Sequence, residues 1–222
     1  MEALVTNPTS TTRPNILVLG ATGPTGRLIV RQALARHYDV TALVRSPEKA
    51  ADLQGVRLVT GDARDPTALH EALQGRDAVV SALGTPVSPF REVTLLSSAT
   101  RALVAAMEAT GVSRLVAITG IGAGDSAGHA GFLFDKVILP LLLRHVYADK
   151  NRQEAVIRAS DLDWVLVRPA ILNDKPARGT VRAMEDLSGF HGGGIAREDV
   201  ARFVLDQVES DRWLRRSPAI AW

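Results

Sequence analysis

Short apolar segments alternate with segments of helical periodicity along most of the chain. The apolar runs are rich in β-branched residues and cover residues 15–19, 40–44, 56–60, 78–83, 115–119 and 164–167. Between two of them, residues 94–110 carry apolar side chains at helical spacing and are followed by Gly111, a residue typical of helix ends. Strands in this rhythm predict an α/β fold with a doubly wound parallel sheet covered by helices on both faces.

The rhythm loosens after Pro169, where a small C-terminal, substrate-side appendage is expected. A turn at 173–176, a strand within 179–184 and a flexible glycine link at 192–194 are predicted there, followed by a helix over 198–209 and a last strand at 219–222. Nothing indicates a second domain, so residues 14–222 are interpreted as one domain. Residues 1–13, which are polar and rich in Thr and Pro, are predicted to be a disordered leader.

The most apolar segment, residues 132–143, carries two charges and a proline. It falls short of the roughly 20 residues that span a bilayer, so no membrane span is predicted. We expect a buried helix or a lid over a bound substrate, with the glycine-rich residues 120–124 as its hinge. An interface for a partner subunit is the alternative.

Composition excludes several functional classes. The chain has 222 residues and no cysteine, which rules out disulfides, thiolate nucleophiles and cysteine-ligated zinc. The 26 Lys and Arg residues barely exceed the 24 Asp and Glu residues and are scattered, so no nucleic-acid partner is expected. His129, His145 and His191 are isolated, so no metal site is predicted. No signal peptide is recognised, and the cytoplasm is the expected compartment.

The most informative motif is a glycine turn between the first apolar run and the first helical segment. It reads Gly20-Ala21-Thr22-Gly23-Pro24-Thr25-Gly26, with glycines spaced G-x-x-G-x-x-G instead of the general G-x-G-x-x-G. Glycines allow a sharp bend and a close approach to a ligand, and the free N–H groups of a first helical turn attract a pyrophosphate. The turn therefore predicts a dinucleotide site.

The residues that end the next strands refine this prediction, since ligands of such sheets lie at the carboxyl ends of the strands. Arg45 and Ser46 follow the second strand, where NAD-binding proteins place an acid; an arginine favours the 2'-phosphate of NADP. A plain surface arginine is the alternative. Asp62, after the third strand, is suited to accept from an adenine amino group or to cap the next helix, although Asp65 is better placed for the cap. Small residues at Gly84 and Thr85 allow backbone to approach a ribose or the nicotinamide, and a tight turn that needs the same residues is the alternative.

Together these segments resemble the atypical short-chain dehydrogenases of the NAD(P)-binding, NmrA-like kind, nearest the biliverdin-IXβ reductase or flavin reductase group. The resemblance spans residues 15–208 and rests on the glycine turn, Val44-Arg45, Gly61-Asp62, residues 77–85 and residues 150–169. It implies a Rossmann fold, NADP(H) as cofactor and a flat conjugated acceptor such as a flavin or tetrapyrrole. Where the biliverdin reductase group has Thr-Ser, this chain has Thr119-Gly120, which weakens the case for a tetrapyrrole.

The resemblance also implies roles for individual residues. The glycine turn is expected to bind the pyrophosphate, and Arg45 and Ser46 are expected to bind the 2'-phosphate. Asp62 and Ala63 are expected to contact the adenine, and residues 83–85 and Lys150 the riboses. Thr119, Gly120 and residues 169–171 are expected to contact the nicotinamide. The implied cofactor contacts are Gly20, Thr22, Gly23, Pro24, Thr25, Gly26, Arg45, Ser46, Asp62, Ala63, Leu83, Gly84, Thr85, Thr119, Gly120, Lys150, Pro169, Ala170 and Ile171.

Candidate catalytic residues are Lys150, Thr119 and Tyr147. Carbonyl reduction by short-chain enzymes usually relies on Tyr-x-x-x-Lys, and Tyr147-Ala148-Asp149-Lys150 is one residue shorter. That spacing argues against carbonyl reduction. Flavins and quinones delocalise the incoming charge, so their reduction needs no dedicated proton donor. For Lys150, a surface pair with Glu154 is the alternative.

Three functions follow, in order of preference. The first is an NADPH-dependent reductase of a conjugated acceptor. The second is a regulatory protein that senses NADP(H) without turnover, as NmrA-like relatives are thought to do. The third is an isomerase or dehydratase of nucleotide sugars, for which a chain of 222 residues leaves little room. A monomer or a weak homodimer is expected.

Overall fold

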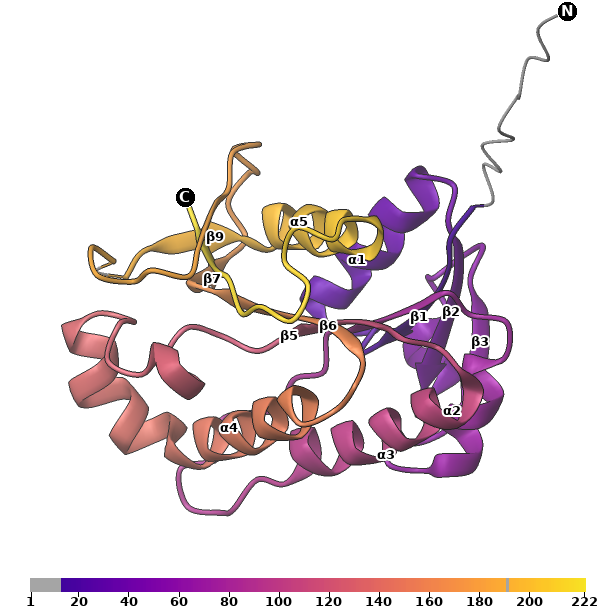
Figure 1. The fold of residues 1–222 in the computed structure, drawn as a ribbon, viewed down its shortest axis with the longest axis horizontal. Helices are drawn as coiled ribbons and strands as arrows, with labels where there is room; N and C mark the ends of the chain where they lie inside the picture. The colour runs from indigo at the N-terminus through magenta and orange to yellow at the C-terminus, as the bar shows by residue number, and fades with distance from the viewer. Residues whose placement is uncertain (1–12, 191) are drawn as a thin grey trace, which may run out of the picture.

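The computed structural model describes residues 13–190 and 192–222, so the predicted leader lies almost wholly outside the described residues. An eight-stranded sheet forms the centre of the domain, in the order β3-β2-β1-β4-β5-β6-β10-β8 (Figure 1). Every neighbouring pair is parallel except β10 and β8. The strands are β1 (Asn15–Leu19), β2 (Asp39–Val44), β3 (Arg57–Thr60), β4 (Ala78–Ser81), β5 (Arg114–Ile118), β6 (Asp163–Pro169), β8 (Arg182–Met184) and β10 (Ala219–Ala221).

Helices cover both faces of this sheet, as the unbroken apolar strands predict. Figure 1 shows α1 and α5 on one face and α2, α3 and α4 on the other. Their bounds are α1 (Pro24–Ala35), α2 (Pro66–Leu73), α3 (Leu95–Thr110), α4 (Arg144–Arg158) and α5 (Arg197–Glu209). Shorter helical segments are η1 (Pro47–Ala50), η2 (Gly124–Ser126) and the π-type η3 (Phe134–Leu143). The doubly wound α/β fold is thus confirmed.

Two hydrophobic cores lie on the two faces of the sheet, because successive side chains of a strand point to opposite sides. In β1, Ile16 and Val18 join the core beneath α1 and α5, whereas Leu17 and Leu19 join the core shared with α2 and α3. All four side chains are fully buried. A run of apolar residues without polar alternation is what a strand covered on both faces requires.

The C-terminal appendage differs in part from the prediction. Two short strands, β7 (Ile171–Asn173) and β9 (Gly194–Ala196), form a separate parallel pair. Neither was expected, and Gly194 belongs to a strand instead of a flexible link. The buried carboxylate of Asp199 at the start of α5 holds this region together, since it accepts from the N–H groups of Arg178 and Gly179 and from the Trp222 indole.

Two helices, α2 and α3, have first-turn N–H groups held by carboxylate side chains. Asp65 accepts from the Thr67 N–H at 2.9 Å and begins α2, which confirms its predicted capping role. Asp149, fully buried on α4, accepts from the N–H of Leu96 at 2.8 Å in the first turn of α3. The bond between Asp149 and Leu96 holds α4 against α3. It therefore fixes the position of Tyr147 and Lys150, which lie close to Asp149 on α4.

Candidate functional site

A cleft of about 620 Å³ lies at the carboxyl ends of the central strands. Strand order reverses between β1 and β4, and this switch point is where doubly wound sheets bind ligands. Fourteen of the predicted site residues line it: Gly20, Thr22, Gly23, Pro24, Thr25, Arg45, Asp62, Ala63, Leu83, Gly84, Thr85, Thr119, Tyr147 and Lys150. Since β2 and β5 stand on opposite sides of the switch point, Arg45 lies toward one end of the cleft and Lys150 toward the other.

The glycine turn is shaped by two close backbone contacts. Gly20 has a φ of 78°, a conformation that side chains disfavour, and a Cβ there would overlap the carbonyl of Ala82. A Cβ on Gly26 would in turn overlap the carbonyl oxygen of Gly20, so Gly26 packs behind the turn and does not line the cleft. Pro24 begins α1 without a side-chain cap. The first-turn N–H groups of α1 therefore stay available for an anion.

A smaller hollow of about 290 Å³ adjoins this turn and is lined by Thr22, Arg45, Ser46 and Lys49. Thr22 and Arg45 line the main cleft as well, so the two spaces adjoin at these residues. Arg27 fixes the segment behind it, because its guanidinium donates to the Lys49 carbonyl at 2.6 Å and pairs with Asp52. Two exposed cations and two hydroxyls around one hollow form a suitable receptor for a phosphate group.

The carboxylate of Asp62 is held by a neighbour on its own loop. Arg64 donates to it through its backbone N–H at 2.9 Å and through its guanidinium at 2.8 Å. Hydrogen bonding to Arg64 and its charge lower the pKa of Asp62 to about 2. Asp62 is therefore an ionised acceptor on the wall of the cleft, and its contact with an adenine stays a prediction.

Tyr147 and Lys150 project from α4 toward the loop that follows β5. The Tyr147 hydroxyl donates to the carbonyl oxygen of Ile121 at 3.0 Å, and the Lys150 ammonium donates to that of Thr119 at 2.7 Å. Burial raises the pKa of Tyr147 to about 12, with Asp135 adding to the shift. Burial lowers the pKa of Lys150 to about 8, and Glu154 opposes that shift. This tyrosine is a weaker acid than a free one, the reverse of what general acid catalysis at neutral pH requires.

Behind Thr119 lies a buried ion pair between Glu154 and Arg168. The Arg168 guanidinium donates to both Glu154 oxygens, at 3.0 and 2.5 Å, and the Thr119 hydroxyl donates to Glu154 at 2.7 Å. All three side chains are at most 5% exposed. Glu154 is thus paired with Arg168, whereas Lys150 lines the cleft. This contradicts the alternative that Lys150 is a surface residue paired with Glu154.

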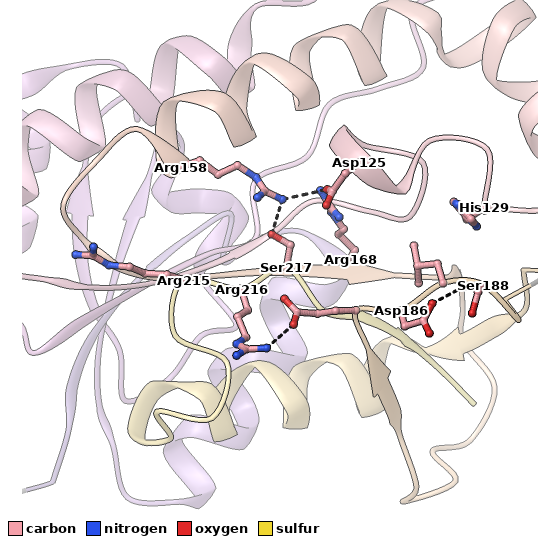
Figure 2. Close-up of a pocket in the computed structure, with 11 residues that line it drawn as sticks. Asp125, His129, Arg158, Arg168, Asp186, Ser188, Arg215, Arg216 and Ser217 are labelled. Atoms are coloured by element: carbon pink, nitrogen blue, oxygen red, sulfur yellow. Dashed lines mark hydrogen bonds and ion pairs between the residues drawn. The ribbon is translucent and has the colours of Figure 1, made fainter.

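A third hollow, of about 370 Å³, is lined by Arg168, the cation of this ion pair (Figure 2). Four arginines line it, but carboxylates of the same chain engage three of them. Asp125 pairs with Arg158 and Arg168, and Glu185 pairs with Arg216. Because these charges compensate one another, this hollow is less suited than the cleft to an anionic cofactor.

Several predicted residues do not line the cleft. Ser46 lines only the adjoining hollow, and Gly120 lies behind Lys150 and Tyr147. Pro169, Ala170 and Ile171 are likewise absent from its walls; Pro169 and Ala170 are buried and Ile171 is 54% exposed. The residues that sequence reasoning missed are Leu43, Val44, Gly61, Ala82, Leu95, Ile118, Pro86, Val146, Leu143, Leu172 and Arg197.

The apolar segment is helical, as predicted, but it is not buried. No residue of η3 is fully buried, and Leu143 is its one residue on the cleft wall. Apolar composition alone does not determine which side of a helix packs against the protein. Only one side of η3 packs against the rest of the domain. The expected buried helix is therefore wrong, whereas a lid motion stays a prediction.

Within the part of the chain that the structure describes, no three His, Asp or Glu side chains gather as a metal site. His191 lies outside that part. None of the helices described there is long and apolar enough to cross a bilayer.

The fold and the cleft define a dinucleotide-binding protein of the Rossmann type. Comparison with known families agrees: the chain belongs to the NAD(P)H-binding family, which matches residues 20–211. The expected resemblance and cofactor class are confirmed by this match. A Bacillus subtilis protein named uncharacterized sugar epimerase YhfK is 28% identical over 201 residues, with 87% of each chain covered. An NAD(P)H azoreductase of Xenophilus azovorans is 32% identical over 156 residues, which are 69% of this chain and 47% of that enzyme.

Solved structures show the same fold. The anaerobillin reductase ChuY of Escherichia coli O157:H7 superposes with a TM-score of 0.80 at 25% identity, covering 93% of this chain and 96% of ChuY. A short-chain dehydrogenase/reductase of Veillonella parvula in complex with NADP has a TM-score of 0.78 at 18% identity, covering 95% of each chain. These superpositions show that the chain has the same Rossmann-type fold as these proteins.

Proposed function

We propose that this protein is an NADPH-dependent reductase that transfers hydride to a flavin, a quinone or a similar flat, conjugated acceptor. One observation carries the proposal. Beyond Thr119, the cleft wall combines the apolar side chains Leu95, Leu143 and Val146 with Lys150, while the Tyr147 hydroxyl is already bonded to backbone. This environment suits an acceptor that stacks and spreads its own charge, and does not suit a carbonyl that needs a proton donor.

The residues present fit NADPH along the cleft. The first turn of α1 is suited to the pyrophosphate, the hollow at Arg45 to the 2'-phosphate, and Lys150 to the nicotinamide ribose. Bound NADPH supplies the hydride. Lys150 then contributes a positive charge beside the acceptor, where negative charge grows as the hydride arrives, and solvent supplies the proton that completes reduction. Reductases among the relatives, one of azo compounds and one of anaerobillin, support this class of reaction.

The direct test is to follow NADPH oxidation by the purified protein with a panel of FMN, riboflavin, quinones and tetrapyrroles. We expect turnover with at least one flavin or quinone. Tight NADPH binding without oxidation by any member of the panel would instead favour the sensor hypothesis.

Arg45→Ala is expected to weaken NADPH binding about 10- to 100-fold, the value of a charge-assisted contact to phosphate, and to leave NADH binding nearly unchanged. Isothermal titration with each nucleotide measures both constants. Arg101→Ala, which removes an exposed arginine of α3 outside the cleft wall, is the matched control. Equal losses for NADPH and NADH in Arg45→Ala would mean that Arg45 does not contact the 2'-phosphate.

Tyr147→Phe is expected to retain most of the turnover number, because the lost hydroxyl bonds to Ile121 and has its pKa raised to about 12. Steady-state kinetics with the best acceptor measure this. A fall in kcat of the ~10²- to 10⁴-fold that removal of a general acid costs would show that Tyr147 donates the proton after all.

Activity is expected to fall as the pH rises through about 8, where the Lys150 ammonium loses its charge. Below that pH the lysine is protonated and its charge is present; above it, the charge beside the acceptor is lost. A pH profile of kcat/KM tests this, with Lys150→Met as the comparison. The variant should be slow and lack this transition, whereas an identical transition in both proteins would assign it to another group.

A further inference from the structure

An exposed apolar surface flanks the mouth of the cleft. In the described part of the chain, nine large hydrophobic side chains are exposed, and seven of them lie on two segments beside the cleft. Five belong to or directly precede η3, and two belong to the loop between β4 and α3. They are Val87, Phe90, Phe132, Leu133, Val137, Leu141 and Leu142, which we call the apolar rim. Pro86 and Leu143, next to these segments, both line the cleft, which places the rim at its mouth.

The rim faces away from the rest of the domain. On its inner side, η3 packs through Phe134, whose ring meets the Tyr147 ring edge to face at 5.6 Å. Leu133, Val137 and Leu141 are spaced four residues apart and are 64%, 40% and 65% exposed. Figure 1 shows this helix at the left end of the molecule, projecting beyond the sheet. Exposed apolar surface of this kind is typical of interaction sites.

Positive charge surrounds the apolar rim. Lys136 and Arg144 on or next to η3 and Arg91 on the facing loop are exposed. Of the acidic residues nearby, Asp135 is half-buried, with one oxygen accepting from the Gly131 N–H at 3.0 Å, and Glu92 pairs with Arg152 at 3.5 Å. The exposed charge at the rim is therefore mainly positive. A surface that is apolar inside and negatively charged at its boundary therefore complements the rim.

We propose that the apolar rim docks on the surface of an anionic phospholipid bilayer, with η3 lying in the interface and Lys136, Arg144 and Arg91 against the lipid phosphates. Helices of this kind lie in the headgroup region without crossing it. A second copy of the chain fits less well, because a two-fold contact through the same face brings identical positive charges together. Docking sets the mouth of the cleft against the bilayer.

Vesicle flotation of the full chain tests the proposal. We expect the protein to float with vesicles of phosphatidylcholine and phosphatidylglycerol, and to float less with pure phosphatidylcholine or at high salt. Val137→Asp/Leu141→Asp should lower the partition coefficient at least tenfold. Lys136→Ala and Arg144→Ala should each lower binding to the mixed vesicles about fivefold and leave binding to pure phosphatidylcholine unchanged.

Leu58→Asp, on exposed β3, is the matched control and should float like the wild type. NADPH binding by every variant confirms that it is folded. The proposal is overturned if the wild type stays with the unbound fraction, or if the rim variants and the control float equally. It is also overturned if sedimentation shows a dimer that Val137→Asp/Leu141→Asp dissociates, since the rim would then bind a second copy.

Discussion

Gly20→Val should abolish measurable NADP(H) binding, with a loss of at least about 100-fold in affinity. The substitution forces a β-branched residue into a left-handed conformation at φ 78° and drives its Cβ into the carbonyl of Ala82. Relief of that overlap moves the turn away from β4 and disorders the N–H groups that α1 presents. Titration with NADPH measures the loss.

Gly75→Val is the matched control for Gly20→Val. Gly75 has a similar φ of 69° but a Cβ there meets nothing within 4 Å. It should therefore show the destabilisation of a strained backbone, roughly 1–2 kcal/mol, with NADPH affinity unchanged. If both variants bind NADPH like the wild type, the glycine turn is not the pyrophosphate site.

Arg168→Leu should lower the free energy of unfolding by about 3–5 kcal/mol, because it leaves the Glu154 carboxylate buried without its partner. Glu154 is 1% exposed and accepts two bonds from Arg168. Urea denaturation followed by circular dichroism measures the difference.

Arg216→Leu removes an arginine from the exposed pair with Glu185 and should cost no more than about 1 kcal/mol. Equal losses in the Arg168 and Arg216 variants would contradict a structural role specific to the buried pair. A smaller loss in an Arg168→Leu/Glu154→Leu double variant than in Arg168→Leu is expected as well, since no charge then remains buried.

Much of the fold is predictable because it depends on local patterns. The apolar runs that become β1, β2, β4, β5 and β6 need only their own residues to be recognised, and Asp65 caps α2 through a bond to a residue two positions away. The short strands β7 and β9 were missed because each has three residues and finds its partner more than 20 positions away. Such pairs carry no periodic signal.

In the candidate site too, the residues that could be predicted are those that local sequence patterns identify. Gly20, Arg45 and Asp62 follow directly from the strand ends, and all three line the cleft. Leu172 and Arg197 enter it from the appendage, whose path no local pattern encodes. The bond from Tyr147 to Ile121 is equally invisible in the sequence: the spacing to Lys150 shows that the usual pair is altered, but not that the hydroxyl faces the backbone.

We propose that hydride leaves NADPH bound in this cleft for a conjugated acceptor. The most direct measurement is a single turnover in which protein loaded with one equivalent of NADPH, deuterated at the transferring position of C4, is mixed with the acceptor and the nucleotide absorbance is followed. We expect complete oxidation, slower with deuterium than with hydrogen, and slower again in Lys150→Met. Nucleotide that stays bound and reduced in the presence of every acceptor of the panel would contradict it.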